Sequence, residues 1–310
     1  MRRRSFFGAA FAGLGSAASA KPPQPRTGDL PRRTLGRTGQ KLSLIGLGGA
    51  RFQMIPFGDG AKLVQRAYDM GINYFDMARS YGGGHNEEVY GAAMGPFRKD
   101  VFVTTKSDKR TRREAEAELD TSLKTMKTDY VDLWQMHMVN TKEIVEQALA
   151  PGGAMEAFVA ARKSGKARFI GFTGHADPAV IVQMLRSTDS FETLLMPLHA
   201  ADTAYLSFEK GALPASVERG VGQLGMKIFA NAFNLRVFSV QDCLSYTLSL
   251  PVTAVTLGVT TQGQLEDDVR IAQNFRPLSN EQMDALRARA VAQKQDVTNG
   301  PSLEYWKRKV

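Results

Sequence analysis

Short apolar runs alternate with stretches of helical spacing along most of the chain. The runs are bounded by turn residues and predict buried strands, at residues 44–48, 72–76, 101–105, 130–136, 169–172, 193–196, 226–230 and 252–257. Apolar residues that recur every three or four positions predict helices between them, at residues 61–70, 87–94, 112–126, 155–164, 178–186, 208–219, 240–250, 264–274 and 279–292. Asn86 is expected to cap one helix, and Pro214 to interrupt another.

This alternation predicts the fold class. Eight strands with intervening helices over residues 33–292 predict one (β/α)8 barrel, or TIM barrel, with a C-terminal helix and tail. Residues 33–43 place the turn residues Gly36 and Gly39 between short β-like pieces and predict an N-terminal β-hairpin. A doubly wound sheet is the competing topology, but the glycines within 46–49 stand too close together for its dinucleotide-binding fingerprint.

Residues 1–20 predict an export signal. The sequence RRSFF at residues 3–7 resembles the twin-arginine export motif of bacteria, and ASA at residues 18–20 is a small-residue cleavage pattern. A frayed or membrane-lying N-terminal helix is the alternative. Residues 21–32 then form a proline-rich linker, and residues 293–310 an irregular tail. This interpretation places the mature protein in the periplasm or elsewhere outside the cytoplasm, and makes the twin-arginine export machinery its partner.

Composition excludes several classes of partner and site. The chain has a formal net charge of +9, but three of its cations are leader arginines, and its cations do not cluster with aromatic residues as on a nucleic-acid-binding face. The apolar segments are too short for a transmembrane helix, so stable membrane insertion is not expected. Cys243 is the sole cysteine, which excludes an intramolecular disulfide and a cysteine-based metal site.

Polar side chains with complementary chemistry follow three consecutive predicted strands. Asp76 ends the second strand, and Tyr81 lies in the glycine-rich loop after it; Lys106 ends the third strand and His137 the fourth. Because the C-terminal ends of barrel strands form the active-site face, these four side chains are expected to converge. Taken singly, each has a simpler explanation, as a strand-end cap, loop packing, a surface lysine or a core histidine.

The four residue types together suit general acid catalysis. A phenol with a pKa of about 10 is a poor donor at neutral pH, and a neighbouring ammonium is expected to lower that pKa by favouring the phenolate. Asp76 would keep Lys106 charged and in place, while His137 would orient a carbonyl oxygen toward Tyr81. The set can protonate an oxygen while its carbon receives a hydride.

Two motifs around these residues carry a family resemblance. GINYFDMARSYGGGHNEEVYG at residues 71–91 and DYVDLWQMH at residues 129–137 are similar to the strand-2 and strand-4 signatures of the aldo/keto reductase family. The hairpin RTLGRTG and the segment GKARFIGFTG at residues 165–174 are also similar, and the resemblance covers residues 33–292. It implies a (β/α)8 barrel that binds NADP(H) or NAD(H), with the four residues above as the catalytic set and Tyr81 as its acid/base.

The resemblance also implies cofactor-binding positions, some of which depart from the family pattern. Thr173 and Gly174 stand where Ser-Asn usually holds the nicotinamide carboxamide, Leu195 where Gln does, and Met226 replaces the usual aromatic platform. The segment after the eighth strand lacks the cations that bind a 2′-phosphate, so NAD(H) stays open beside NADP(H). The acids at 267–268 correspond to an adenine-contacting pair. The implied cofactor-binding residues are Gly49, Ala50, Arg51, Thr173, Gly174, Met226, Lys227, Leu257, Gly258, Val259, Thr260, Gln264, Asp267 and Asp268.

The remaining histidines also follow predicted strands. His85, His175 and His199 are expected on the active face with His137. One interpretation makes them contacts to a polar, hydroxyl-rich substrate such as a sugar; another makes them incidental loop residues. A metal would need a fixed ligand geometry and supporting residues, and no metal site is expected.

Three functions compete at this point. The leading hypothesis is an NAD(P)-dependent oxidoreductase that transfers hydride between its cofactor and a carbonyl or alcohol substrate. Because free NADPH is scarce outside the cytoplasm, an exported enzyme could instead hold its cofactor tightly and recycle it on sugar-like substrates, as a sugar oxidoreductase or epimerase. The third is a non-catalytic barrel that senses the cofactor, against which the complete polar set argues.

Overall fold

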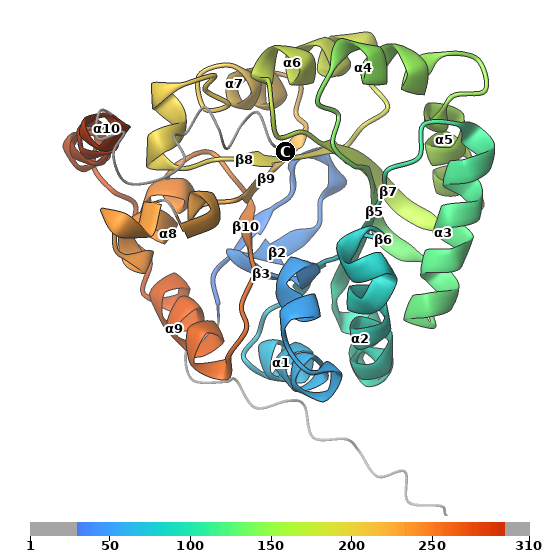
Figure 1. Ribbon diagram of the computed structural model, residues 1–310, viewed down its shortest axis with the longest axis horizontal. Helices are drawn as coiled ribbons and strands as arrows, with labels where there is room; N and C mark the ends of the chain where they lie inside the picture. The colour runs from blue at the N-terminus through green and yellow to red at the C-terminus, as the bar shows by residue number, and fades with distance from the viewer. Residues whose placement is uncertain (1–29, 233, 295–310) are drawn as a thin grey trace, which may run out of the picture.

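The computed structural model describes residues 30–232 and 234–294. Within this range one closed barrel of parallel strands is surrounded by helices (Figure 1). The expected export signal at 1–20, and most of the linker at 21–32 and of the tail at 293–310, lie outside the described residues. Their interpretation therefore stays a prediction.

The barrel strands follow one another around the barrel in chain order, and the last pairs with the first. They are β3 (Ile45–Gly48), β4 (Tyr74–Asp76), β5 (Phe102–Ser107), β6 (Val131–Met136), β7 (Ala167–Thr173), β8 (Thr193–Pro197), β9 (Gly222–Met226) and β10 (Ala254–Leu257). This arrangement confirms the predicted (β/α)8 TIM barrel.

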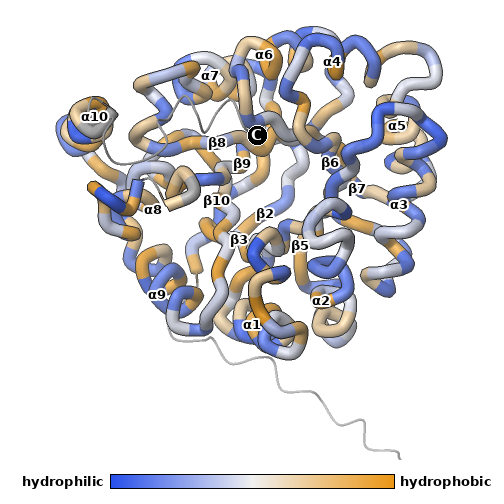
Figure 2. The backbone as a smooth tube through the Cα atoms, in the orientation of Figure 1, coloured by the Kyte–Doolittle hydropathy of each residue, from blue (hydrophilic) through white to orange (hydrophobic). Residues whose placement is uncertain are grey.

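Helices connect the strands and form the outer layer. They are α1 (Phe57–Asp69), α2 (His85–Ala93), α3 (Arg112–Met126), α4 (Lys142–Leu149), α5 (Ala154–Ser164), α6 (Pro178–Ser187), α7 (Ala212–Glu218), α8 (Val240–Ser249), α9 (Gln262–Gln273) and α10 (Asn280–Lys294). Short 3-10 segments are η1 (Gly36–Thr38), η2 (Gly49–Met54), η3 (Tyr81–Gly84), η4 (Gly95–Asp100), η5 (Ala200–Ala204), η6 (Ala230–Ala232) and η7 (Asn234–Arg236). Hydropathy alternates along the outer helices in Figure 2, as expected where only one face of a helix is buried.

Side-chain caps fix where several helices begin. The side chains of Thr111, Asp177 and Thr261 accept hydrogen bonds from backbone N–H groups in the first turns of α3, α6 and α9. At the start of α8, Ser239 and Asp242 form a reciprocal capping box. These caps satisfy donors that have no partner within a helix, so the loops end at defined residues.

The predicted N-terminal hairpin is present and closes one end of the barrel. Strands β1 (Arg32–Thr34) and β2 (Lys41–Ser43) pair antiparallel. Leu35 and Leu42 are buried in a cluster with apolar side chains from the barrel interior. Leu35 lies against Gly222 at the start of β9, where even a Cβ atom would be 2.6 Å from it. The hairpin therefore covers the N-terminal ends of the strands and leaves the C-terminal ends for a site.

Some predicted elements differ from those observed. The pattern predicts a strand at residues 226–230, but β9 ends at Met226, because the glycine-rich segment before it is the one that pairs with β8. Pro214 does not interrupt α7; it lies in the first turn, where its missing N–H breaks no helical hydrogen bond. Helix α1 begins at Phe57 rather than at residue 61, and α4 was not predicted.

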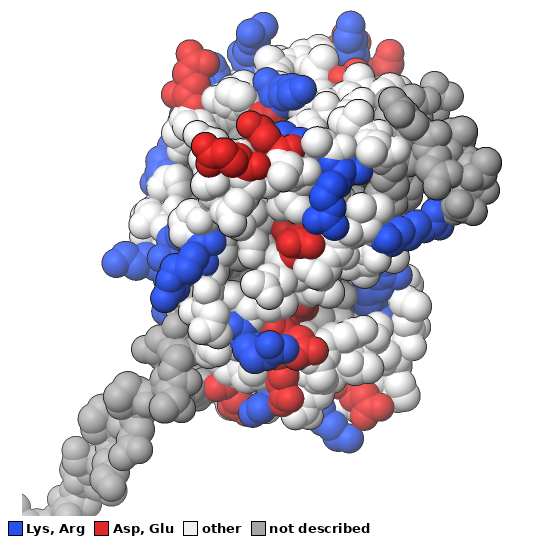
Figure 3. All heavy atoms as spheres, turned by 90° about the vertical axis from the view of Figure 1, so that its left-hand side faces the viewer, with Lys and Arg blue, Asp and Glu red and all other residues white. Residues whose placement is uncertain are grey.

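The outer surface carries charges of both signs. On the face that includes α8, α9 and α10, lysines and arginines are interspersed with aspartates and glutamates (Figure 3). Among the described residues, every helix is too short or too polar to cross a bilayer.

Asp132 on β6 holds the barrel wall together near the hairpin end. Its Oδ2 atom accepts hydrogen bonds from Arg98 Nη1 at 2.8 Å and from the Val103 amide at 2.9 Å. Its Oδ1 atom accepts one from Arg168 Nη1 at 2.6 Å. Asp132 is buried, and so is Arg98. Removing the carboxylate would leave the Arg98 charge buried without its partner.

We expect Asp132→Ala to lower the free energy of unfolding by roughly 3–5 kcal/mol, because breaking a buried pair leaves an uncompensated charge. Urea denaturation measures the change. Asp120 provides the control, since its ion pair with Lys166 is exposed and its loss should cost less than about 1 kcal/mol. Equal losses in both variants would contradict this role for Asp132.

Candidate active site

A buried ion pair between Lys106 and Asp76 lies at the centre of the site. Lys106 Nζ donates to Asp76 Oδ2 at 2.8 Å and to the Met77 carbonyl at 2.6 Å, while Thr104 Oγ1 donates to Asp76 Oδ1 at 2.7 Å. Lys106 is 1% exposed and Asp76 is 3% exposed. The register of β4 against β5 pairs Asp76 with Thr104 and so brings the two strand ends together.

Lys106 keeps its charge in this environment. Burial alone would lower the pKa of Lys106, but its interactions with Asp76 and Tyr81 together raise that pKa above its ordinary value. The ammonium group is therefore a fixed positive charge at the C-terminal end of the barrel.

Tyr81 is the side chain that this charge faces. Tyr81 begins η3, and Lys106 Nζ lies 4.9 Å from the centroid of its ring. Burial raises the pKa of the phenol, and Lys106 opposes this effect only in part. The expectation that Lys106 brings the pKa below its usual value is therefore wrong in its net result. Tyr81 therefore carries its proton at neutral pH.

Asn86 holds the loop that presents Tyr81. Its Nδ2 atom donates to the carbonyls of Ala78 at 2.7 Å and Tyr81 at 2.8 Å, and its Oδ1 atom accepts from the Ala78 amide at 3.2 Å. The predicted capping role is wrong, because Gly84 occupies the cap position of α2 and Asn86 lies inside the helix. A sequence ending in Asn-Glu-Glu is typical of a helix start, so the loop contacts could not be foreseen.

His137 follows β6 and completes the group. Its ring meets the Tyr81 ring edge-on, with the centroids 5.8 Å apart. Nδ1 lies 2.7 Å from Asp108 Oδ1 and 3.4 Å from Ser80 Oγ. Burial lowers the pKa of His137, and its hydrogen bond with Asp108 offsets only part of that change. The structure thus brings all four predicted catalytic residues together, and adds Asp108, which sequence reasoning missed.

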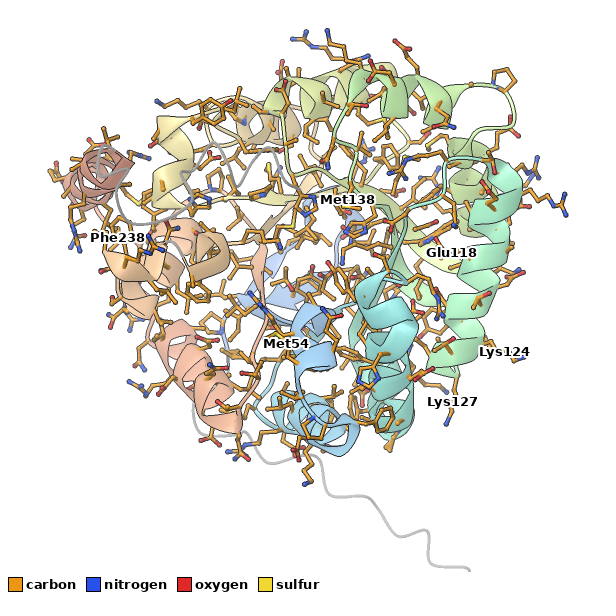
Figure 4. All side chains as sticks on the ribbon, in the orientation of Figure 1. Met54, Glu118, Lys124, Lys127, Met138 and Phe238 are labelled. Carbon is orange, nitrogen blue, oxygen red and sulfur yellow. The ribbon has the colours of Figure 1, made fainter. Side chains whose placement is uncertain are left out.

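The backbone just after His137 has a strained conformation. Met138 has φ 54°, in the left-handed region, and lies near the middle of the ring of helices in Figure 4. Thr173 Oγ1 accepts a hydrogen bond from the Met138 amide at 2.9 Å, and Arg110 donates to the His137 carbonyl. The hydroxyl oxygen of Thr173, expected to anchor a carboxamide, already supports this loop.

A cavity of about 640 Å³ opens beside the ion pair, within the usual size range of small-ligand sites. Asp76 and Tyr81 line one part of it. Gly49, Thr173 and Gly174 do not line it. Met54, from η2, does, and is labelled in Figure 4. The predicted cofactor-binding residues that line the cavity are Ala50, Arg51, Met226, Lys227, Leu257, Gly258, Val259, Thr260, Gln264, Asp267 and Asp268.

Comparison with known proteins agrees with this geometry. The sequence profile described as "Aldo/keto reductase family" matches residues 44–233. The chain belongs to the aldo/keto reductase family. L-galactose dehydrogenase of Arabidopsis thaliana is 32% identical over 162 residues, which are 46% of this chain and about half (48%) of that protein. The uncharacterized oxidoreductase YqkF of Bacillus subtilis is 24% identical over 313 residues, 86% of this chain and 97% of that protein.

Solved structures share the fold of this aldo/keto reductase. The holo form of an aldo-keto reductase from Bacillus halodurans superposes with a TM-score of 0.69 at 20% identity, covering 84% of this chain and 96% of that one. A thermostable aldo-keto reductase in complex with the inhibitor epalrestat gives a TM-score of 0.70 at 24% identity, covering 84% and 99%. Family members are oxidoreductases, typically NAD(P)-dependent.

The cavity of this aldo/keto reductase suits a polar, anionic cofactor. Arg51, Lys227 and Arg270 line it, and the buried hydroxyl oxygen of Thr256 at its wall has no hydrogen-bond partner among the described residues. Burial, with Arg51 and Lys106 adding repulsion, lowers the pKa of Lys227. A phosphate group placed there would relieve that repulsion. These observations fit a dinucleotide.

Arg270 was not among the predicted residues. It lies in α9, one helical turn after Asp267, and its Nη2 atom is 2.5 Å from Asp267 Oδ1. The predicted residues of this helix are Gln264 and the acids at 267–268, and the sequence pattern does not single out the arginine that follows them. A cation is therefore present at this end of the cavity, although an acid already pairs with it.

The three additional histidines each follow a barrel strand, as predicted, but their surroundings differ. His175 is buried with its ring 6.0 Å from that of His137, and its Nδ1 atom has no hydrogen-bond partner among the described residues. His199 is also buried, just before η5. His85 begins α2, packs against the Phe57 ring of α1 and does not line the cavity, so a role for it in substrate binding stays a prediction. The described residues include no cluster of side chains able to hold a metal.

Asp268 allows a test of the charge state of the cavity. Burial, with Asp267 adding repulsion, raises the pKa of this carboxyl to about 7. The folded protein therefore binds a proton more tightly than the unfolded chain, and this stabilising effect disappears as pH rises through about 7.

We expect the wild-type protein to lose roughly 1–4 kcal/mol more stability than Asp268→Asn between about pH 5 and about pH 8. Urea denaturation of both proteins at the two pH values measures the difference. Asp189→Asn, at an exposed site, should follow the wild type. Parallel pH dependence in wild type and Asp268→Asn would show that the carboxyl titrates normally.

Proposed function

We propose that this chain is an NAD(P)-dependent oxidoreductase that transfers hydride between a nicotinamide cofactor and a carbonyl or alcohol substrate, with Tyr81 as its general acid/base. The observation that carries the proposal is a protonated phenol beside the buried Lys106–Asp76 pair, at the wall of a cavity with basic residues. A barrel without catalytic function has no need of a buried cation directed at a tyrosine.

The proposed chemistry follows from the charges. When bound, a reduced nicotinamide supplies the hydride to the carbonyl carbon. Tyr81 gives its phenolic proton to the carbonyl oxygen, so the substrate leaves as an alcohol and the side chain becomes phenolate. Lys106 stabilises that phenolate, and Asp76 holds Lys106 in place. In the oxidative direction the phenolate takes the proton from the alcohol.

The cofactor, NADP(H) or NAD(H), would lie along the cavity. Arg51 and Lys227 would face its phosphates, and Gly258 leaves room for the Arg51 side chain, whose Cγ lies 2.8 Å from the place of a Cβ atom. Asp267 and Asp268 would face its adenosine end. Thr173 does not line the cavity, so as a proposed carboxamide contact it would meet the cofactor beyond the cavity wall. The hydrogen of its hydroxyl is available for this contact, since Met138 uses only the oxygen.

We expect Tyr81→Phe to reduce kcat for small aldehydes by about 10²- to 10⁴-fold, because the acid is lost, while the dissociation constant for the cofactor stays unchanged. Steady-state kinetics and cofactor titration measure the two effects. Tyr130→Phe is the matched control, since Tyr130 precedes β6 at the opposite end of the barrel. Undiminished kcat in Tyr81→Phe would refute the assigned role.

We further propose that the protein is exported folded, with its cofactor bound, and acts on sugar-like substrates in the periplasm. The RRSFF motif at residues 3–7 motivates the export step. The relative named L-galactose dehydrogenase acts on a sugar and supports the substrate class. Tight retention would let one nucleotide be oxidised and reduced in turn.

We expect the native protein from the periplasmic fraction to release about one nicotinamide nucleotide per chain on denaturation after dialysis, as identified by mass spectrometry. Replacing Arg3 and Arg4 by lysine should leave the protein in the cytoplasmic fraction. Wild-type protein found only in the cytoplasm would refute export, and an empty periplasmic protein would refute retention.

A further inference from the structure

The contact between His137 and Asp108 fixes the direction of a hydrogen bond. Burial alone would raise the pKa of Asp108, but its hydrogen bond and attraction to His137, with help from Ser80 and Arg110, lower that pKa below its ordinary value. An ionised carboxylate only accepts hydrogen bonds. The Nδ1 atom of His137, 2.7 Å from Asp108 Oδ1, must therefore carry the proton.

The other nitrogen of His137 is then an acceptor. Nε2 makes no hydrogen bond with the described part of the protein, so it is the nitrogen left for a ligand. The groups that act on the ring are Asp108, Ser80, Lys106, Asp76, Tyr81 and His175. Burial in their midst lowers the pKa of the imidazole, and a neutral imidazole protonated on Nδ1 presents a lone pair at Nε2.

The His137 ring, which carries this acceptor, lies next to the ring of Tyr81, which carries a hydrogen-bond donor. The Tyr81 and His137 rings are 5.8 Å apart and nearly perpendicular, at 79°. A phenolic O–H and an imidazole lone pair carried by two rings in contact can bind two neighbouring oxygens of one small molecule. A carbonyl oxygen accepts from Tyr81 but has no hydrogen to give to Nε2, so His137 would not hold the carbonyl oxygen as the sequence led us to expect. A hydroxyl on the adjacent carbon would donate to Nε2 instead.

We propose that Asp108 is a positioning residue that keeps the proton of His137 on Nδ1, which leaves Nε2 as an acceptor and matches the site to substrates with a hydroxyl beside the carbonyl group. In the oxidative direction the corresponding substrates are vicinal diols. The substrate class rests on the proposed function, whereas the position of the proton on His137 does not.

The loop that carries Asp108 is held on both sides. Ser107, at the end of β5, donates to Glu118, and the Lys109 amide donates to Ser107 Oγ at 3.2 Å. Glu118 extends from α3 toward the barrel in Figure 4. Arg110 reaches the His137 carbonyl. A carboxylate anchored in this way keeps the imidazole in one orientation before any substrate arrives.

The proton position can be read directly by NMR of protein with ¹⁵N-labelled histidine at neutral pH. We expect His137 to show a protonated Nδ1 and a bare Nε2, with its signals assigned from their loss in His137→Gln. In Asp108→Asn, whose amide both donates and accepts, the population should shift toward the Nε2-protonated form. A wild-type His137 that is protonated on Nε2, or on both nitrogens, would overturn the proposal.

Kinetics test the consequence for specificity. Lactaldehyde and propanal differ by one hydroxyl next to the carbonyl, so their ratio of kcat/KM isolates its contact. We expect the wild-type enzyme to prefer lactaldehyde, and Asp108→Asn to reduce that preference roughly two- to tenfold, as for loss of one hydrogen bond. Asp120→Asn, at the exposed pair with Lys166, should leave the ratio unchanged.

These outcomes separate the possible failures. If Asp108 only stabilised the fold, Asp108→Asn would lower kcat/KM for both aldehydes equally and leave the proton on Nδ1, which would refute the positioning role. If neither aldehyde were reduced by the wild type, the proposed function would fail for this class, while NMR would still decide where His137 carries its proton. Thermal unfolding of each variant confirms that it is folded.

Discussion

A buried positive charge imposes the main constraint on this molecule. Lys106 lies almost wholly out of water, and a buried ammonium is tolerated only beside a compensating anion. Asp76 supplies that anion from the neighbouring strand, so the register of β4 against β5 has to be exact to within one residue. Thr104 donates a hydrogen bond to the same carboxylate, and the loop held by Asn86 keeps Tyr81 beside the charge.

Burial shifts the pKa values of neighbouring side chains in opposite directions. It raises the pKa of Tyr81 and lowers that of His137, so both rings are neutral at neutral pH. Lys106 escapes this trend because Asp76 is in direct contact with it. The site therefore combines one fixed charge with two uncharged side chains of opposite hydrogen-bonding character, and Asp108 determines the character of one of them.

The sequence predicts the barrel and the four central residues because strand ends converge by topology, whatever the side chains do in detail. It does not predict Asp108, whose role depends on a partner from another strand, nor Arg270, which faces the cavity from inside a helix. The capping prediction for Asn86 fails because a helix cap and a contact to the preceding loop use the same residue type. The strand predicted at residues 226–230 is placed too late because the glycines of β9 carry no hydrophobic pattern. Met226, at the end of β9, nevertheless lines the cavity.

The N-terminal hairpin also leaves one end of the barrel available for attaching the protein to a surface while the cavity at the other end stays open to small molecules. Strands β1 and β2 cover the end of the barrel where the strands begin, and Leu35 seals it against β9. A solid support attached through the exposed side of the hairpin would therefore hold the molecule by the end opposite the cavity. The enzyme can be tethered by that end while small molecules still enter and leave at the other, so immobilisation and turnover are compatible in this architecture.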